Sequence, residues 1–156
     1  MEIQLLAIGT RVPAWIDQGF SDYAKRFGGD CKLIVREISS PRKSRSEDAR
    51  RVKQLEGQKL LASVSADTYL IALDPRGVHL ATDAVAEKLD DWFQHHRTVA
   101  LMIGGADGLS AECLAASREQ WSLSKMTFPH ALVRVIVAEQ IYRAYSMLKN
   151  HPYHRG

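Results

Sequence analysis

A continuous apolar run near the middle of the chain stops at two adjacent glycines, in the stretch Thr98-Val99-Ala100-Leu101-Met102-Ile103-Gly104-Gly105-Ala106-Asp107-Gly108. The run does not alternate apolar and polar side chains, so it predicts a strand that is buried on both faces. The glycines let the backbone turn sharply directly after this strand. Such a turn either only reverses the chain or also brings the backbone close to a ligand.

Further apolar runs alternate with stretches of helical spacing on both sides of this strand. The expected strands are residues 3–8, 33–38, 69–73 and the strand-like segment 121–128. The expected helices are residues 13–27, 47–64 and 82–95, a short helix capped by Ser110, and a long helix from Pro129 to about Asn150. Buried strands separated by helices predict an α/β fold with a parallel sheet covered on both faces. The 156 residues fit a single domain, residues 1–156.

Several common kinds of site are excluded. Gly9 alone follows the first expected strand, where a dinucleotide-binding turn has three glycines, and no P-loop motif occurs. Cys31 and Cys113 lie far apart without clustered histidines, so we expect neither a disulfide framework nor a metal site. The N-terminal apolar segment is too short for a signal peptide and no run is long enough to span a bilayer. We therefore expect a cytoplasmic protein that does not enter a membrane.

The net charge of +3 is modest, but the basic residues are concentrated in two regions. The first comprises Arg42, Lys43, Arg45, Arg50, Arg51, Lys53 and Lys59, and the second comprises Arg134, Arg143, Lys149, His151, His154 and Arg155. Two such regions would bracket a polyanion such as RNA. Either region alone is equally typical of a solvated surface.

Ligands of parallel sheets bind beyond the carboxyl ends of the strands, and three loops are expected at that edge, at residues 74–77, 104–108 and 127–130. Residues 123–130 combine short hydroxyls with apolar side chains. This mixture suits an adenine and a sulfonium, but also a plain last strand followed by a helix. The long helix that follows has a broad apolar surface, which indicates burial in the core or at the interface of a homodimer.

The C-terminal tail, His151-Pro152-Tyr153-His154-Arg155, is unusually rich in rings and cations for a chain end. Stacking on rings and phosphate contact by cations are the means of RNA recognition. An incidental or weakly metal-binding tail would contain the same side chains.

These segments, together with the motifs Leu5-Leu6-Ala7-Ile8-Gly9-Thr10, Leu73-Asp74-Pro75-Arg76-Gly77, Ser122-Leu123-Ser124-Lys125-Met126-Thr127-Phe128-Pro129-His130 and Glu139-Gln140-Ile141-Tyr142-Arg143-Ala144, follow one another in the order of a known family. The chain resembles the RlmH family of 23S rRNA pseudouridine-N3-methyltransferases, within the SPOUT superfamily, over essentially its whole length. The resemblance implies a parallel-sheet SPOUT fold with a C-terminal trefoil knot, a homodimer, and S-adenosyl-L-methionine as cofactor. It also implies methylation of N3 of a pseudouridine in 23S rRNA, on the assembled ribosome.

Two sets of site residues follow from this resemblance, and neither needs a metal. The implied cofactor contacts are Leu73, Gly104, Leu123, Ser124, Lys125, Met126, Thr127 and Phe128, with Gly105 shaping the turn. The candidates for the reaction are His154 as base or orienter, Arg143 and Arg155 as charge stabilisers, Tyr153 as a stacking platform, and His130 as a further acid–base group. We expect the tail to be flexible enough to close over the target base.

Two other functions fit the same residues less fully. One is a SPOUT methyltransferase with a different RNA target, such as tRNA. The other is a non-catalytic, ribosome-associated RNA-binding protein, which would have no need of a cofactor pocket at Gly104 and residues 123–128.

Overall fold

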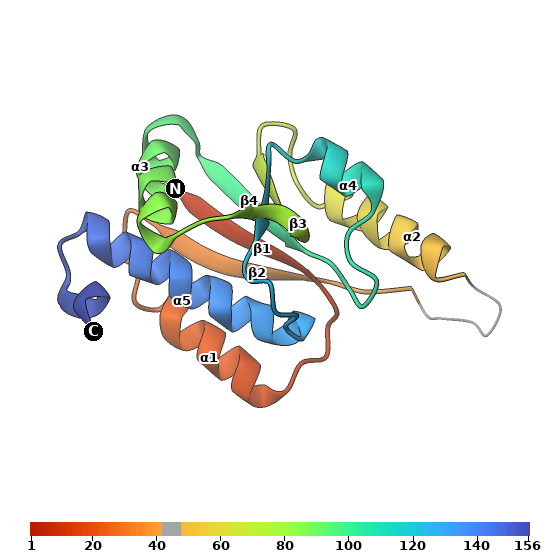
Figure 1. The fold of residues 1–156 in the computed structure, drawn as a ribbon, viewed down its shortest axis with the longest axis horizontal. Helices are drawn as coiled ribbons and strands as arrows, with labels where there is room; N and C mark the ends of the chain where they lie inside the picture. The colour runs from red at the N-terminus through yellow and green to blue at the C-terminus, as the bar shows by residue number, and fades with distance from the viewer. Residues whose placement is uncertain (42–47) are drawn as a thin grey trace.

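The computed structural model describes residues 1–41 and 48–156, and in them five parallel strands form one sheet in the order β2-β1-β4-β3-β5 (Figure 1). The strands are β1 (Glu2–Ile8), β2 (Lys32–Ile38), β3 (Tyr69–His79), β4 (Thr98–Ile103) and β5 (Glu119–Ser122). The helices are α1 (Ala14–Ala24), α2 (Ala49–Ala62), α3 (Thr82–His95), α4 (Ala111–Ala116), α5 (His130–Leu148) and the 3-10 helix η1 (Pro152–Arg155). The predicted α/β fold with a parallel sheet is confirmed.

The alternation of side chains along the central strands creates two apolar cores, one on each face of the sheet. On one face, Leu101 of β4 packs in a core shared with α1, α3 and α5. On the other face, Met102 packs in a core shared with α2 and α4. Because both faces of the sheet are covered, neither face of β4 is exposed to solvent, which explains its continuous apolar sequence.

Helix α5 lies on the same face of the sheet as α1 and α3 and packs against both of them (Figure 1). Its first turns are fixed by Arg134, whose side chain is only 1% exposed. The Arg134 guanidinium donates from Nη1 to Glu37 Oε1 at 3.0 Å and from Nη2 to the Gly9 carbonyl oxygen at 2.7 Å. The helix is therefore tied at its start to the ends of β1 and β2, and it is held along its length by the core.

Two predicted strand boundaries are wrong. Strand β3 does not stop before Asp74 but continues to His79, and its pairing with β5 shifts register between Leu73 and Val78. Beyond Leu73 the strand pairs only with β5, which lets Pro75 occupy it without breaking a ladder to β4. At Gly77 a Cβ would lie 2.6 Å from the backbone of β5, so the close approach of the strands requires glycine there.

Strand β5 is the second correction, because it spans Glu119–Ser122 and not residues 121–128. After Ser122, local hydrogen bonds replace the ladder. Ser122 Oγ donates to the Ser124 carbonyl oxygen at 3.2 Å, and Ser124 Oγ accepts from the Met126 amide at 3.0 Å. The segment that the sequence assigned to a strand is therefore a turn.

Part of the first basic region, Arg42, Lys43 and Arg45, lies outside the described residues. Helix α2 begins after Asp48, whose side chain caps it by accepting from the Arg50 amide at 3.1 Å. In the described ranges, no helix is both long and apolar enough to cross a membrane, and no group of three or more His, Cys, Asp or Glu side chains is arranged to hold a metal ion. The trefoil knot stays a prediction.

The assignment of Leu101 to the core on one face of the sheet is testable, because this side chain has no exposed surface. Leu101→Ala should lower the free energy of unfolding by about 2–5 kcal/mol, because it leaves a cavity inside a packed core. Urea denaturation measures this loss. The control is Val78→Ala, at a side chain that is 63% exposed, which should change stability by less than about 0.5 kcal/mol. Equal effects of the two substitutions would contradict the assignment of the core.

Candidate functional site

A cavity of about 650 Å³ opens beside the middle of β3 and the carboxyl ends of β4 and β5. Three segments that are distant in sequence meet there: the middle of β3, the loop after β4 and the turn after β5. All the residues implied as cofactor contacts line this cavity, namely Leu73, Gly104, Gly105, Leu123, Ser124, Lys125, Met126, Thr127 and Phe128. His130, at the first turn of α5, lines it as well. The three expected segments therefore converge, but residues 74–77 are part of strand β3 and not the loop that the sequence predicted.

The loop after β4 is too tight to carry a side chain at Gly104. A Cβ there would lie 2.5 Å from the carbonyl carbon of Gly108 and 2.8 Å from its oxygen. Gly108 has a φ of +81° and donates its amide to the Gly105 carbonyl oxygen at 3.0 Å, which closes the loop. The wall that this loop gives to the cavity consequently consists of main-chain groups.

The turn after β5 gives the cavity a different kind of wall. Leu123 and Phe128 supply apolar surface, and the exposed side chain of Met126 lies beyond the turn that Ser124 stabilises. Together with Leu73 on β3, these residues offer apolar surface beside the main-chain groups of the loop after β4. That combination is typical of pockets for small organic ligands.

Four charged residues at the cavity were missing from the expected cofactor contacts: Lys53, Asp74, Arg76 and Asp107. Asp74 accepts from the Arg76 amide at 2.9 Å and from Arg76 Nε at 3.0 Å. These hydrogen bonds from Arg76 hold the pKa of the Asp74 carboxyl below its usual value. The sequence did contain a signal for this pair, because both residues directly follow the apolar run that ends at Leu73, at the edge where ligands bind.

The tail is not at the cavity of its own chain. His151 caps η1 through its Nδ1, which accepts from the Tyr153 amide at 3.2 Å, and His154 Nδ1 lies 3.5 Å from Ser146 Oγ on α5. Ser146 follows His130 by sixteen residues of one helix, which at ~1.5 Å per residue is roughly 24 Å. Of the residues proposed for the reaction, His130 alone lines the cavity, whereas Arg143, Tyr153, His154 and Arg155 lie toward the other end of α5.

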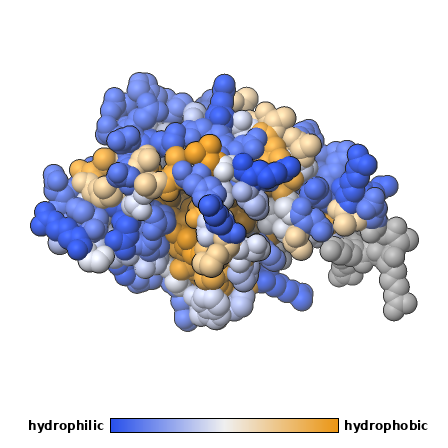
Figure 2. All heavy atoms as spheres, viewed as in Figure 1, coloured by the Kyte–Doolittle hydropathy of each residue, from blue (hydrophilic) through white to orange (hydrophobic). Residues whose placement is uncertain are grey.

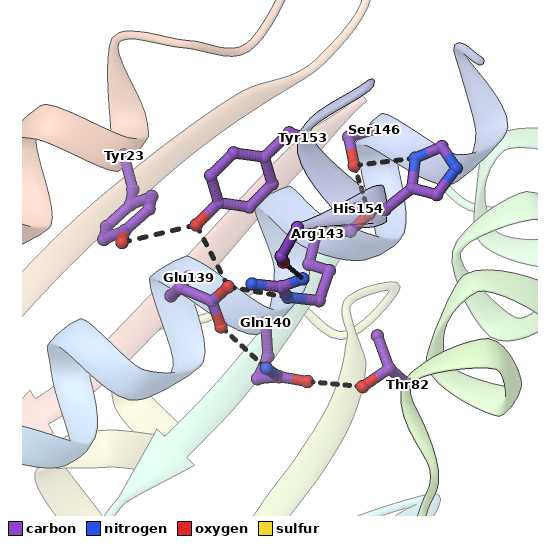
Figure 3. A network of polar contacts seen from close by, with 9 residues as sticks. Tyr23, Thr82, Glu139, Gln140, Arg143, Ser146, Tyr153 and His154 are labelled. Carbon is purple, nitrogen blue, oxygen red and sulfur yellow. Dashed lines mark hydrogen bonds and ion pairs between the residues drawn. The ribbon is translucent and has the colours of Figure 1, made fainter. Parts of the chain in front are cut away.

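The tail is also docked, where the sequence led us to expect a flexible segment. Figure 3 shows Tyr153 pointing toward Glu139, where its hydroxyl donates to Oε1 at 3.1 Å. Arg143 donates from Nε to the same oxygen at 2.8 Å. Burial, and hydrogen bonds with Tyr23 and Glu139, raise the pKa of Tyr153, so its phenol stays protonated at neutral pH.

The ring of Tyr153 is packed as well, with its centroid 4.9 Å from that of Tyr142. Within one subunit it is an anchor of the tail and not an open surface for stacking.

Comparison with known proteins identifies the family. The family model described as "Predicted SPOUT methyltransferase" matches residues 1–154. The chain belongs to the SPOUT methyltransferase family. It is 46% identical to the protein named Ribosomal RNA large subunit methyltransferase H of Methylococcus capsulatus, over 99% of this chain and 100% of the relative. Proteins of the same name from Coxiella burnetii and Thioalkalivibrio sulfidiphilus are 46% and 43% identical, over 99% of this chain and 100% and 99% of those relatives.

A methyltransferase needs a methyl donor, so the cavity of this SPOUT methyltransferase is testable by donor binding. If S-adenosyl-L-methionine is that donor, Gly104→Ala should weaken the binding of its product S-adenosylhomocysteine at least about tenfold, because the added Cβ forces the loop backbone to move. Calorimetry measures the dissociation constant. Gly29→Ala, where a Cβ would have no atom within 4 Å, is the matched control and should bind as the unsubstituted protein does. Unchanged affinity in Gly104→Ala would move the donor site elsewhere.

Proposed function

We propose that this SPOUT methyltransferase transfers a methyl group from S-adenosyl-L-methionine to N3 of a pseudouridine in 23S rRNA. The convergence of the middle of β3 and the ends of β4 and β5 on one cavity is the observation that carries this proposal. The relatives named as large-subunit rRNA methyltransferases support the choice of substrate.

The cavity fits the proposed cofactor in size and in chemistry. Its volume of about 650 Å³ is within the range of small-molecule sites. Leu73, Leu123 and Phe128 would hold the adenosine between apolar walls, and main-chain groups of residues 123–128 would hydrogen-bond its polar edge. At Gly104 the absence of a side chain lets the backbone of Gly108 pack closely, which shapes the loop that lines the cavity. The cofactor, when bound, supplies an electrophilic methyl group.

The protein's own residues must align the target base and remove a proton from its N3. His130 stands at the cavity and is one candidate to accept that proton. His154 is the other, with Arg143 and Arg155 to stabilise negative charge on the base. Alignment alone can contribute several kcal/mol, up to roughly 7–11 kcal/mol in ideal cases. The protein need not supply a nucleophile, because N3 of the base itself takes the methyl group.

The tail can serve a cavity only if it belongs to a second subunit. Within one chain, roughly 24 Å of helix separates His154 from His130. In an antiparallel pair of α5 helices, which a twofold axis perpendicular to them generates, the tail end of each helix would meet the cavity end of the other.

The surface of α5 supports this arrangement. Leu132 and Ile136 are only half-buried, and apolar surface occupies the middle of the face that carries α5 (Figure 2). We therefore propose a homodimer with two composite sites.

The assembled ribosome is the substrate that best suits a chain of this size. We propose that the basic surface of this chain itself finds the target. Arg50, Arg51 and Lys53 lie on α2, and Lys53 reaches the cavity itself. This places positive charge beside the proposed site, where it would contact rRNA phosphates. A ribosomal substrate also implies a cytoplasmic location.

The substrate is testable with ribosomes from cells that lack this protein. Mass mapping of their 23S rRNA should find a pseudouridine without its N3-methyl group, and purified protein with S-adenosyl-L-methionine should restore it. Naked 23S rRNA should be methylated much more slowly. Methylation of tRNA instead of 23S rRNA would make the protein a SPOUT enzyme with another target. If it methylates no RNA, and the donor does not raise its thermal stability, the protein is a non-catalytic binder.

The composite site is testable by mixing two inactive variants. Gly104→Trp should lose its cavity but keep its tail, and deletion of residues 153–156 should abolish methylation but leave donor binding intact. After subunit exchange, a mixed dimer has one intact cavity that faces an intact tail from the partner. An equal mixture should therefore regain about a quarter of the unsubstituted activity, from random pairing of subunits. Methylation by the truncated variant alone, or no recovery on mixing, would contradict a tail that acts across the dimer.

A further inference from the structure

The C-terminal tail has one anchor on α5 that no expected role accounts for, the carboxylate of Glu139. Its side chain is 19% exposed and accepts three hydrogen bonds (Figure 3). Oε1 accepts from Arg143 Nε at 2.8 Å and from the Tyr153 hydroxyl at 3.1 Å, and Oε2 accepts from Gln140 Nε2 at 2.6 Å. Two residues proposed for the reaction are thus held by the same oxygen atom.

The anchor extends from Glu139 to the last residue of the chain. Arg143, once paired, donates from Nη1 to the Gly156 carbonyl oxygen at 3.2 Å. Its guanidinium also lies over the ring of Tyr153, 5.0 Å from the centroid. The carboxylate therefore fixes Tyr153 directly and Gly156 through Arg143, and His154 and Arg155 lie between these two fixed points.

The other side of Glu139 is tied to a different helix. Gln140 accepts from Thr82 Oγ1 at 2.9 Å, and Thr82 begins α3. This contact holds the amide that donates to Oε2, so the carboxylate is oriented before the tail docks against it. A carboxylate suits this position because both of its oxygens accept, whereas an amide of the same shape has one accepting oxygen and presents N–H donors in place of the other.

We propose that Glu139 is the positioning residue of the tail: it sets where Tyr153 and Arg143 lie, and through them how His154 and Arg155 reach the target base in the partner's cavity. This inference depends on the proposed function only for the role of the tail in methylation. The docking of the tail on Glu139 is separately measurable in the protein without substrate.

The test compares Glu139→Gln with Glu87→Gln, which removes the same charge from an exposed site on α3. In Glu139→Gln, hydrogen exchange at the amides of residues 153–156 should accelerate at least tenfold, while exchange in α5 and the thermal midpoint stay unchanged. The kcat for methylation of ribosomes should fall at least tenfold, with less than a twofold change in KM for S-adenosyl-L-methionine. Glu139→Asp, which keeps the charge, should recover part of both losses, and Glu87→Gln should match the unsubstituted enzyme.

Unchanged exchange in the tail of Glu139→Gln would overturn the inference and leave the proposed function standing. A tail that loosens without any loss of kcat would also overturn it, since the position of the tail would then not matter for the reaction. If deletion of residues 153–156 leaves methylation intact, the tail has no role in the proposed reaction. This result comes from a variant in which Glu139 is unchanged, so it is distinguishable from a failure of the inference about Glu139.

Discussion

One helix, α5, separates the two groups of side chains that we propose for the reaction. Helix α5 is packed between α1 and α3, and Arg134 ties its start to the ends of β1 and β2. Bending such a helix would break its hydrogen bonds and open the core, so its length is a fixed distance. The cavity lies at its first turn and the tail at its last. A site that uses both must be built from two chains.

The sheet explains why the cavity was predictable from sequence. Continuous apolar runs mark β3 and β4 as buried strands, and the ends of parallel strands meet at one edge. That reasoning alone brings Leu73 and Gly104 together, although 31 positions separate them, and the structure places both on one cavity. The binding roles of these residues come from the family resemblance and stay a prediction, since geometry by itself does not name a ligand.

Other features depend on contacts that no local pattern contains. Strand β3 continues past Pro75 only because β5, more than forty residues later, pairs with one side of it. The tail docks because Tyr153 meets Glu139 on α5, with Tyr23 of α1 beside it, 130 positions earlier in the chain. From sequence, a chain end rich in rings and cations is indistinguishable from a flexible one. The anchoring role of Glu139 therefore emerges only from the folded structure.

The composite site is tested most directly by the distance from tail to cavity across the dimer. Cys31 and Cys113 are buried, and burial raises the pKa of the Cys31 thiol to about 11, so spin labels would attach selectively to introduced cysteines. With Lys125→Cys in one subunit and Gly156→Cys in its partner, we expect label separations well below the length of α5. The reference is one chain that carries both labels. If the two labels in mixed dimers are never closer together than in that single chain, the result contradicts a site shared by two subunits.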